Sequence, residues 1–141
     1  MHTKKFFVHF NQVDHAQKMY FAEMFDLAHR TLEDFCQHKA NGWTTWFDNS
    51  EWAVPIVNAQ CQYHLPIFAG DHLQAQLSVQ EIGKSSLTLK TTFSKVGDEG
   101  STESPAKPVA EVVTTHVFVD KKVQAKMQVP QSIREMISCE L

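Results

Sequence analysis

The chain has 141 residues, of which 43% are hydrophobic and 21% charged, and its formal net charge is −3 at pH 7. This size and composition predict one globular domain over 1–141. The negative net charge argues against a nucleic-acid-binding surface, and no apolar run approaches the length of a membrane span. The three cysteines are odd in number and lack CxxC spacing, which predicts reduced thiols and a cytoplasmic setting.

The N-terminal part of the chain predicts one strand followed by one long helix. Residues 6–10 alternate between apolar and wetter positions, as in a half-buried strand. Residues 20–39 then repeat apolar side chains at helical spacing, and Asn41-Gly42 is a typical helix stop. The expected buried face of this helix consists of Phe21, Met24, Phe25, Ala28, Leu32, Phe35 and Cys36.

The rest of the chain is predicted to be mostly strand. Residues 43–53 are aromatic and irregular, and are expected to form a loop or a short helix. Period-2 alternation then predicts a series of strands, with a flexible polar connection over 95–108. The expected elements are strands at 57–65, 73–79, 87–93 and 109–119, a short strand or tail at 121–129, and a short helix at 130–141. One long helix followed by regularly spaced strands predicts an α+β fold, with an antiparallel sheet of five or six strands.

Asp14 is the most informative single residue, because it lies between the first strand and the long helix. The first N–H groups of a helix have no intrahelical acceptor and carry partial positive charge. A carboxylate beside them can act as a nucleophile or base on a carbonyl that these donors hold. Spacing alone favours a simpler role, in which Asp14 only stabilises the helix end electrostatically, because acids before helices are common. His15 can modulate the protonation of the acid, or can be an ordinary exposed loop histidine.

Other candidate chemistry is sparse. The Lys84-Ser85-Ser86 turn offers charge and hydroxyls to a phosphate, although such residues fill many turns. The eight histidines are scattered without metal-ligand spacing, so no metal site is expected. Neither a glycine-rich phosphate loop nor a G-x-S-x-G elbow is present. Cys61 lies on the expected buried face of its strand, which argues against a catalytic cysteine.

Taken in order, several segments resemble the hotdog-fold thioesterases of the 4-hydroxybenzoyl-CoA thioesterase type. The run from Phe10 to Gln17 is similar to that family's F-G-D-x-D-x-A-G motif, and Tyr20-Phe21 is similar to its aromatic pair at the helix start. Pro66 to Asp71 resembles its P-x-x-x-G-D turn. The resemblance covers nearly the whole chain, and includes Pro55-Ile56-Val57, the Lys84–Ser86 turn and Val129-Pro130.

The chain departs from the family pattern at three positions in the Asp14 segment. Gln12 replaces the first acid, and Lys18 stands where an aliphatic residue is usual. Gln17 replaces a glycine, so the path of the loop depends on whether that position needs positive φ.

The resemblance implies a sheet wrapped around one helix and the hydrolysis of an acyl-CoA thioester. Asp14 matches the catalytic acid, and Phe21 matches the position whose backbone N–H polarises the thioester carbonyl. The Lys84–Ser86 turn matches a region that helps to hold the CoA nucleotide. Tyr20, His15 and the aromatic segment 43–52 are expected at the substrate. Phe21 stands where some members have histidine, and is closer to the aryl-CoA and 1,4-dihydroxy-2-naphthoyl-CoA members.

The resemblance also implies a homodimer or homotetramer, because the family pairs its sheets. CoA is part of the substrate, so neither a metal nor a redox cofactor is implied, and neither nucleic acid nor a membrane is an expected partner. Two alternatives remain open. The acyl group can be carried on a carrier protein, or the chain can bind acyl-CoA or another apolar ligand without turnover.

Overall fold

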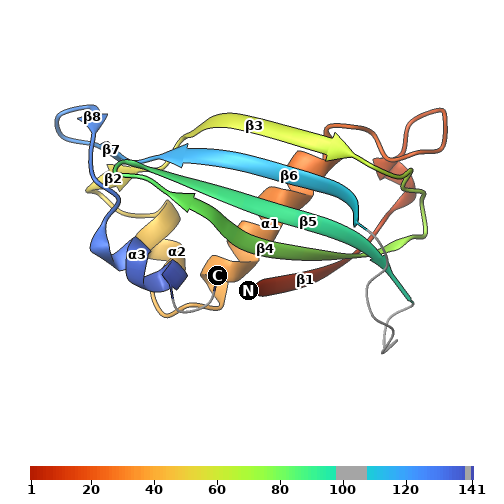
Figure 1. Ribbon diagram of the computed structural model, residues 1–141, viewed down its shortest axis with the longest axis horizontal. Helices are drawn as coiled ribbons and strands as arrows, with labels where there is room; N and C mark the ends of the chain where they lie inside the picture. The colour runs from red at the N-terminus through yellow and green to blue at the C-terminus, as the bar shows by residue number, and fades with distance from the viewer. Residues whose placement is uncertain (98–107, 139–140) are drawn as a thin grey trace.

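The computed structural model describes residues 1–97, 108–138 and 141, and it has an α+β fold (Figure 1). Its main feature is an antiparallel five-stranded sheet in the order β1-β4-β5-β6-β3, with the long helix α1 (Glu23–Gln37) against one face. The predicted fold class is therefore confirmed. The strands are β1 (His2–Phe7), β3 (Ile56–Tyr63), β4 (His72–Ile82), β5 (Ser86–Val96) and β6 (Pro108–Val117).

The core lies between α1 and the inner face of β4 and β5. Alternate residues of these strands point inward, because successive side chains of a strand lie on opposite faces. Leu73, Leu77, Leu89 and Phe93 are almost completely buried in this way. Each fully buried side chain of this size contributes about 1.5–3 kcal/mol relative to an exposed one. The helix side of the core consists of Met24, Leu27, Ala28, Leu32, Phe35 and Cys36.

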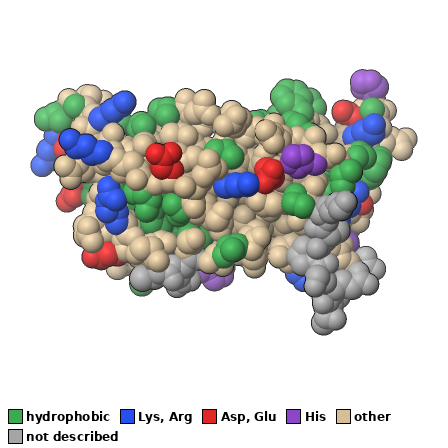
Figure 2. All heavy atoms as spheres, viewed as in Figure 1, with side chains coloured by type: hydrophobic (Ala, Val, Ile, Leu, Met, Phe, Trp, Pro, Cys, Tyr) green, Lys and Arg blue, Asp and Glu red, His purple; other side chains and the backbone are tan. Residues whose placement is uncertain are grey.

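The outer face of the sheet is largely polar in Figure 2. Glu111 on β6 forms an ion pair with Lys90 at 2.6 Å and another with His64 at 2.9 Å. These hydrogen bonds, that of Lys90 first, hold the pKa of Glu111 below its ordinary value. The charged row crosses neighbouring strands, as cross-strand pairs of opposite charge do when they stabilise a sheet.

Strand β3 is unusual because nearly all of its residues are exposed. Only Cys61 is partly buried, and Ile56, Val57 and Tyr63 are 44%, 58% and 49% exposed. β3 pairs with β6 along one edge and forms the end of the sheet, so no described strand lies beside its other edge. An eight-residue edge with apolar side chains and no charged residue is a template for pairing with another strand.

A small second unit closes one end of the molecule (Figure 1). Buried side chains of Trp46, Phe118, Ile133 and Ile137 join it to the core. Its elements are α2 (Gly42–Phe47), α3 (Gln131–Ser138) and a three-stranded sheet of β2 (Trp52–Ala53), β7 (Val119–Asp120) and β8 (Ala125–Lys126). Within the described residues, no helix is long and apolar enough to span a membrane.

Three sequence predictions need correction. The first strand is β1 and ends at Phe7, and Phe10 is 84% exposed beyond it. The helix begins at Glu23 and not at Tyr20, so Phe21 is not on its buried face. The alternation over 57–65 does not produce a buried face, because β3 lies at the edge of the sheet. The predicted flexible connection falls mostly on 98–107, outside the described residues.

Candidate active site

Asp14 lies in a tight, exposed turn that follows a short 3-10 helix, η1 (Phe10–Gln12). Its N–H donates to the Lys18 carbonyl at 2.9 Å, and its own carbonyl accepts the Gln17 N–H at 2.9 Å. Gln17 has a φ of 64°, in the left-handed region. The chain thus follows a path that glycine would take freely, and a side chain there costs about 1–2 kcal/mol.

One oxygen of the Asp14 carboxylate accepts a hydrogen bond, and the other has no partner among the described residues. Oδ1 accepts the Ala16 N–H at 2.8 Å, which orients the side chain. Oδ2 has no hydrogen-bond partner among the described residues, so it is available to a substrate or a water. His15 is exposed in the same turn and makes no hydrogen bond to the described residues. The structure therefore does not bring His15 into contact with the acid.

The segment between Asp14 and α1 is held in place by backbone hydrogen bonds. The Met19 N–H donates to Ile67 at 2.7 Å, and the Tyr20 N–H donates to Gln12 at 2.9 Å. The Tyr20 carbonyl accepts the Glu23 N–H at 3.0 Å. Because a peptide is planar and trans, the Phe21 N–H points away from that carbonyl. No acceptor for the Phe21 N–H is present in the described part of the chain, so this donor is free.

Tyr63, at the end of β3, connects this segment to the sheet. Its hydroxyl donates a hydrogen bond to the Phe21 carbonyl. Desolvation and the neighbouring Cys61 raise the pKa of Tyr63 to about 12, so the phenol stays protonated and remains a donor. The predicted strand at 57–65 includes Tyr63, but its sequence pattern could not indicate this contact, because the partner lies 42 residues away in the chain.

Gln12, which stands where the resemblance expects an acid, has a structural role. It is nearly buried, and its Oε1 accepts the His9 N–H at 2.8 Å. Its Nε2 lies 3.5 Å from the Glu23 carboxylate in the first turn of α1. The amide therefore links η1 to the helix start, while Asp14 remains the exposed carboxylate of this loop.

Two hollows lie near these residues. A groove of about 340 Å³ runs between the Lys18-Met19 segment and the end of β3, where Tyr63 lines it. A smaller apolar cavity of about 120 Å³ lies between α1 and the sheet. Phe25 and Leu32 line its helix side, and Ala59 lines its β3 side. The cavity therefore begins one helical turn beyond Phe21 and continues along the helix.

His116 of β6 is one of the four described polar residues that line this largely apolar cavity, together with His29, Thr91 and Thr114. It is 2% exposed, and its Nε2 lies 2.9 Å from the Thr114 hydroxyl. Its Nδ1 is buried without a hydrogen-bond partner among the described residues. Burial, with a smaller effect of His29, lowers the pKa of His116 to about 4, so the ring is neutral at pH 7. Nothing in the sequence distinguished His116, which lies in the most β-branched stretch of the chain.

The aromatic residues expected at the substrate do not line this apolar cavity. The Tyr20 ring packs at a tilt of 60° against the Phe21 ring, with 4.8 Å between centroids, and Tyr20 lines a separate polar groove beside Glu23. In the 43–52 segment, Trp46 packs edge-on to the His116 ring at 5.6 Å. Phe47 lies 5.8 Å from the His29 ring, measured between ring centroids. These two rings support residues that line the apolar cavity, but do not line it themselves.

The Lys84–Ser86 turn joins β4 to β5, at the opposite end of the sheet from the Asp14 loop (Figure 1). The Lys84 carbonyl accepts the Val129 N–H, and the Ser85 carbonyl accepts the Phe118 N–H. The exposed Lys84 ammonium has no ion-pair partner within the described residues. An eleven-residue strand is roughly 35 Å long, so this turn and Asp14 do not meet within one chain.

Comparison with known proteins gives consistent similarities. The model of a family described as the thioesterase-like superfamily matches residues 8–137. A 1,4-dihydroxy-2-naphthoyl-CoA hydrolase of Crocosphaera subtropica is 27% identical, over 92% of this chain and 90% of that protein. One from Nostoc punctiforme is 30% identical, over 89% of this chain and 79% of that protein. The crystal structure of a 1,4-dihydroxy-2-naphthoyl-CoA thioesterase from Synechocystis shares the fold, with a TM-score of 0.81, 21% identity, and coverage of 99% and 96% of the two chains.

Proposed function

The chain belongs to the thioesterase-like superfamily and has its hotdog fold, and we propose from this membership that it hydrolyses acyl-CoA thioesters. The observation that carries the proposal is that one segment, held in place by backbone hydrogen bonds, presents both a carboxylate oxygen and an N–H donor without protein partners among the described residues. These are the Oδ2 of Asp14 and the backbone N–H of Phe21. A thioesterase needs a carboxylate that attacks or activates water, and a donor for the oxyanion that then forms.

In the proposed reaction, the thioester carbonyl accepts the Phe21 N–H while Asp14 acts at the carbonyl carbon. Asp14 attacks as a nucleophile, or takes a proton from a water that attacks. In both routes the C–S bond breaks, water supplies the hydroxyl of the free acid, and the sulfur leaves as CoA. One preorganised donor of this kind is worth roughly 10²–10³ in rate.

The apolar cavity is the proposed site of the distal end of the acyl group, and it favours an aryl group with a hydroxyl. A cavity of about 150 Å³ holds benzene, so 120 Å³ suits the outer part of one ring. The neutral His116 ring has one donor and one acceptor nitrogen, and Thr114 occupies Nε2 in either tautomer. A ligand hydroxyl can donate to Nδ1 or accept from it, and so it can satisfy Nδ1 in either tautomer of His116. The two named relatives act on a hydroxylated aryl-CoA, which supports this choice.

We also propose that the working unit contains at least two chains joined at β3. The exposed, uncharged edge of β3 supports this pairing. Two copies related by a two-fold axis would pair their β3 strands antiparallel and extend the sheet. The Lys84–Ser86 turn of one copy would then lie at the same end as the Asp14 loop of the other. The turn would lie three to four strand spacings from the β3 of the first copy, or roughly 14–19 Å, over which an extended CoA can reach.

The test is steady-state hydrolysis of a thioester panel by the wild-type chain and by Asp14→Asn. The panel contains aryl-CoAs with and without a ring hydroxyl, aliphatic acyl-CoAs and acyl groups on a carrier protein. We expect the highest kcat/KM for a hydroxyaryl-CoA, and a loss of at least about 10²-fold in Asp14→Asn, because an amide cannot serve as nucleophile or base.

The control is the folded state of the variant, measured by circular dichroism and thermal unfolding. Asp14 is exposed and holds only the Ala16 N–H, so Asp14→Asn should unfold near the wild-type temperature. Hydrolysis by Asp14→Asn within a few fold of wild type would exclude the mechanism. Tight binding of acyl-CoA without turnover by the wild type would favour the non-catalytic alternative.

A further inference from the structure

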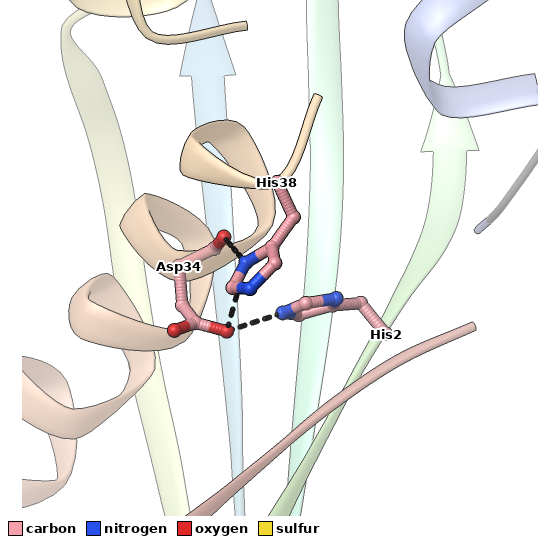
Figure 3. Close-up of side chains that lie close together, drawn as sticks. All are labelled: His2, Asp34 and His38. Atoms are coloured by element: carbon pink, nitrogen blue, oxygen red, sulfur yellow. Dashed lines mark hydrogen bonds and ion pairs between the residues drawn. The ribbon is translucent and has the colours of Figure 1, made fainter. Parts of the chain in front are cut away.

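Three potential metal-binding side chains meet where β1 begins and α1 ends, far from Asp14 (Figure 3). They are His2 of β1, Asp34 of α1 and His38, which directly follows α1. One ring nitrogen of each histidine and one carboxylate oxygen all lie within 4.8 Å of one another. The fifteen-residue helix is roughly 22 Å long, so this cluster is separate from the Phe21 segment.

The atoms of the cluster converge on a single carboxylate oxygen. The Nε2 of His2 lies 2.7 Å from Asp34 Oδ2, and the Nδ1 of His38 lies 3.7 Å from the same oxygen. An ion bound at roughly 2.0–2.1 Å from each donor separates neighbouring donors by roughly 2.9–3.4 Å. The His2–Asp34 distance must therefore open by a few tenths of an ångström, and the His38 ring must turn to present Nε2, the nitrogen that does not contact the Asp34 carbonyl. His38 is exposed, so its ring is free to make this adjustment.

Two further contacts prepare these groups for a metal. The Lys4 ammonium donates to Asp34 Oδ1 at 2.9 Å, which leaves Oδ2 as the oxygen facing the histidines. The Nδ1 of His38 lies 2.7 Å from the Asp34 backbone carbonyl. A carbonyl only accepts, so this contact places the proton on Nδ1 and leaves the lone pair on Nε2. Ligating histidines and carboxylates usually have outer partners of this kind, which fix the tautomer and the orientation.

We propose that His2, Asp34 and His38 bind one divalent first-row transition-metal ion. Two imidazoles and one carboxylate suit Zn²⁺, Co²⁺, Ni²⁺ or Fe²⁺, whereas Mg²⁺ and Ca²⁺ prefer oxygen ligands alone. Water would fill the remaining coordination positions. The ion would cross-link the first strand to the end of the long helix, across 32 residues of sequence. No sequence pattern indicated the site, because its ligands come from distant segments and only Asp34 and His38 have helical i,i+4 spacing.

The competing interpretation is an ion-pair network that needs no metal. In that case Asp34 simply accepts hydrogen bonds from Lys4 and His2. The two interpretations differ in a measurable way, because only a metal site gives saturable binding of one ion per chain. The probe is Co²⁺, whose spectrum separates nitrogen and oxygen ligands from thiolates. This distinction matters because the chain has three cysteines.

The experiment is a Co²⁺ titration of the metal-free, untagged chain, followed by calorimetry and by visible absorption. Untagged protein is needed because His2 lies next to the N-terminus and polyhistidine binds Co²⁺. The variants are His38→Gln and Asp34→Asn. The matched control is His64→Gln. His64 pairs with the carboxylate of Glu111, and the described residues place no third potential metal ligand beside this pair.

We expect one Co²⁺ per chain, weak visible bands without a thiolate charge-transfer band, and a higher melting temperature with Co²⁺. His38→Gln and Asp34→Asn should each weaken binding at least about tenfold, since outer-partner losses alone cost 10–100-fold. His64→Gln should bind like the wild type. His38 is exposed, so His38→Gln remains a valid test even if Asp34→Asn unfolds. Failure of the wild type to bind at 1 mM Co²⁺, a thiolate spectrum, or unchanged binding by His38→Gln would overturn the proposal.

Discussion

His116 is a buried polar residue whose environment makes a specific demand on its protonation. Its ring is almost wholly buried beside Trp46, and only Nε2 has a protein partner among the described residues. An unsatisfied buried nitrogen costs about 1–3 kcal/mol, and a buried positive charge would cost more. The fold therefore tolerates His116 only in its neutral form, and a ligand hydroxyl at Nδ1 would remove the remaining penalty.

We predict that His116 makes the free energy of unfolding depend on pH between about 6.5 and 4. Its pKa is lowered from 6.5 to about 4 in the folded state, so in this window the unfolded chain binds more protons than the folded one. The stability from this group is fully present above pH 6.5 and is lost as the pH falls towards 4. The shift corresponds to about 3 kcal/mol at most.

The measurement is urea unfolding at pH 7.5 and pH 4.5 for the wild type and His116→Gln. The variant should lose much less stability between the two pH values, because glutamine does not titrate. His15→Gln, which removes an exposed histidine, should keep the wild-type pH dependence. Parallel pH profiles for the wild type and His116→Gln would show that His116 is not held neutral.

At the residue scale, sequence reasoning is suited to positions that depend on local chain geometry. Asp14 could be proposed as the catalytic acid because its position between a strand and a helix can be read directly from the sequence. Tyr63 and His116 were missed because their roles depend on partners from other elements. The replacement of a glycine by Gln17 raised the question of whether this position has positive φ. Only the backbone of the structure shows that it does.

At the scale of elements, the contact between β3 and the start of α1 has a testable role. The Tyr63 hydroxyl holds the Phe21 carbonyl, and so it fixes the peptide that follows the proposed oxyanion donor. We predict that Tyr63→Phe lowers kcat about 2- to 10-fold and changes KM little, since a net hydrogen bond is worth about 0.5–1.5 kcal/mol.

The measurement is kcat and KM on the best substrate of the panel, together with the melting temperature. A purely structural role would lower stability and leave kcat of the folded enzyme unchanged. Tyr63→Phe with wild-type kcat would therefore show that this hydrogen bond does not position the Phe21 segment.

The presence of the helices and strands could be predicted from the periodicity of apolar residues. Where each element ends, and which of its faces is buried, could not. The apolar spacing over 20–39 is real, yet α1 starts at Glu23 because Tyr20 and Phe21 enter a hydrogen-bonded turn. The alternation over 57–65 is also real, but β3 is almost entirely exposed among the described residues. Periodicity reports the local pattern of side chains, while burial depends on which element lies opposite.

At the scale of the whole molecule, the open edge of β3 predicts the oligomeric state. We expect a species of at least twice the 16.1 kDa chain mass at micromolar concentration. Val57→Lys should shift the protein towards the monomer, because a lysine on an edge strand opposes strand pairing. Sedimentation velocity measures both proteins across a dilution series.

The matched control is Val123→Lys, which places the same charge at a valine that is 71% exposed away from the edge. It should sediment like the wild type. A wild-type chain that remains a monomer throughout the series, or a Val57→Lys protein that keeps the wild-type mass, would contradict pairing through β3.

The antiparallel edge of β3 also determines what happens when two defective chains are mixed. If Asp14 of one copy works with the Lys84 turn of the other, Asp14→Asn and Lys84→Ala lie in different halves of each site. A mixed dimer then has one doubly damaged site and one site with no substitution at all. Random exchange of subunits restores about a quarter of the sites to wild type. At low substrate concentration, a mixture of Asp14→Asn and Lys84→Ala should therefore hydrolyse the thioester faster than either variant alone. Variants of a single-chain site could not complement each other in this way.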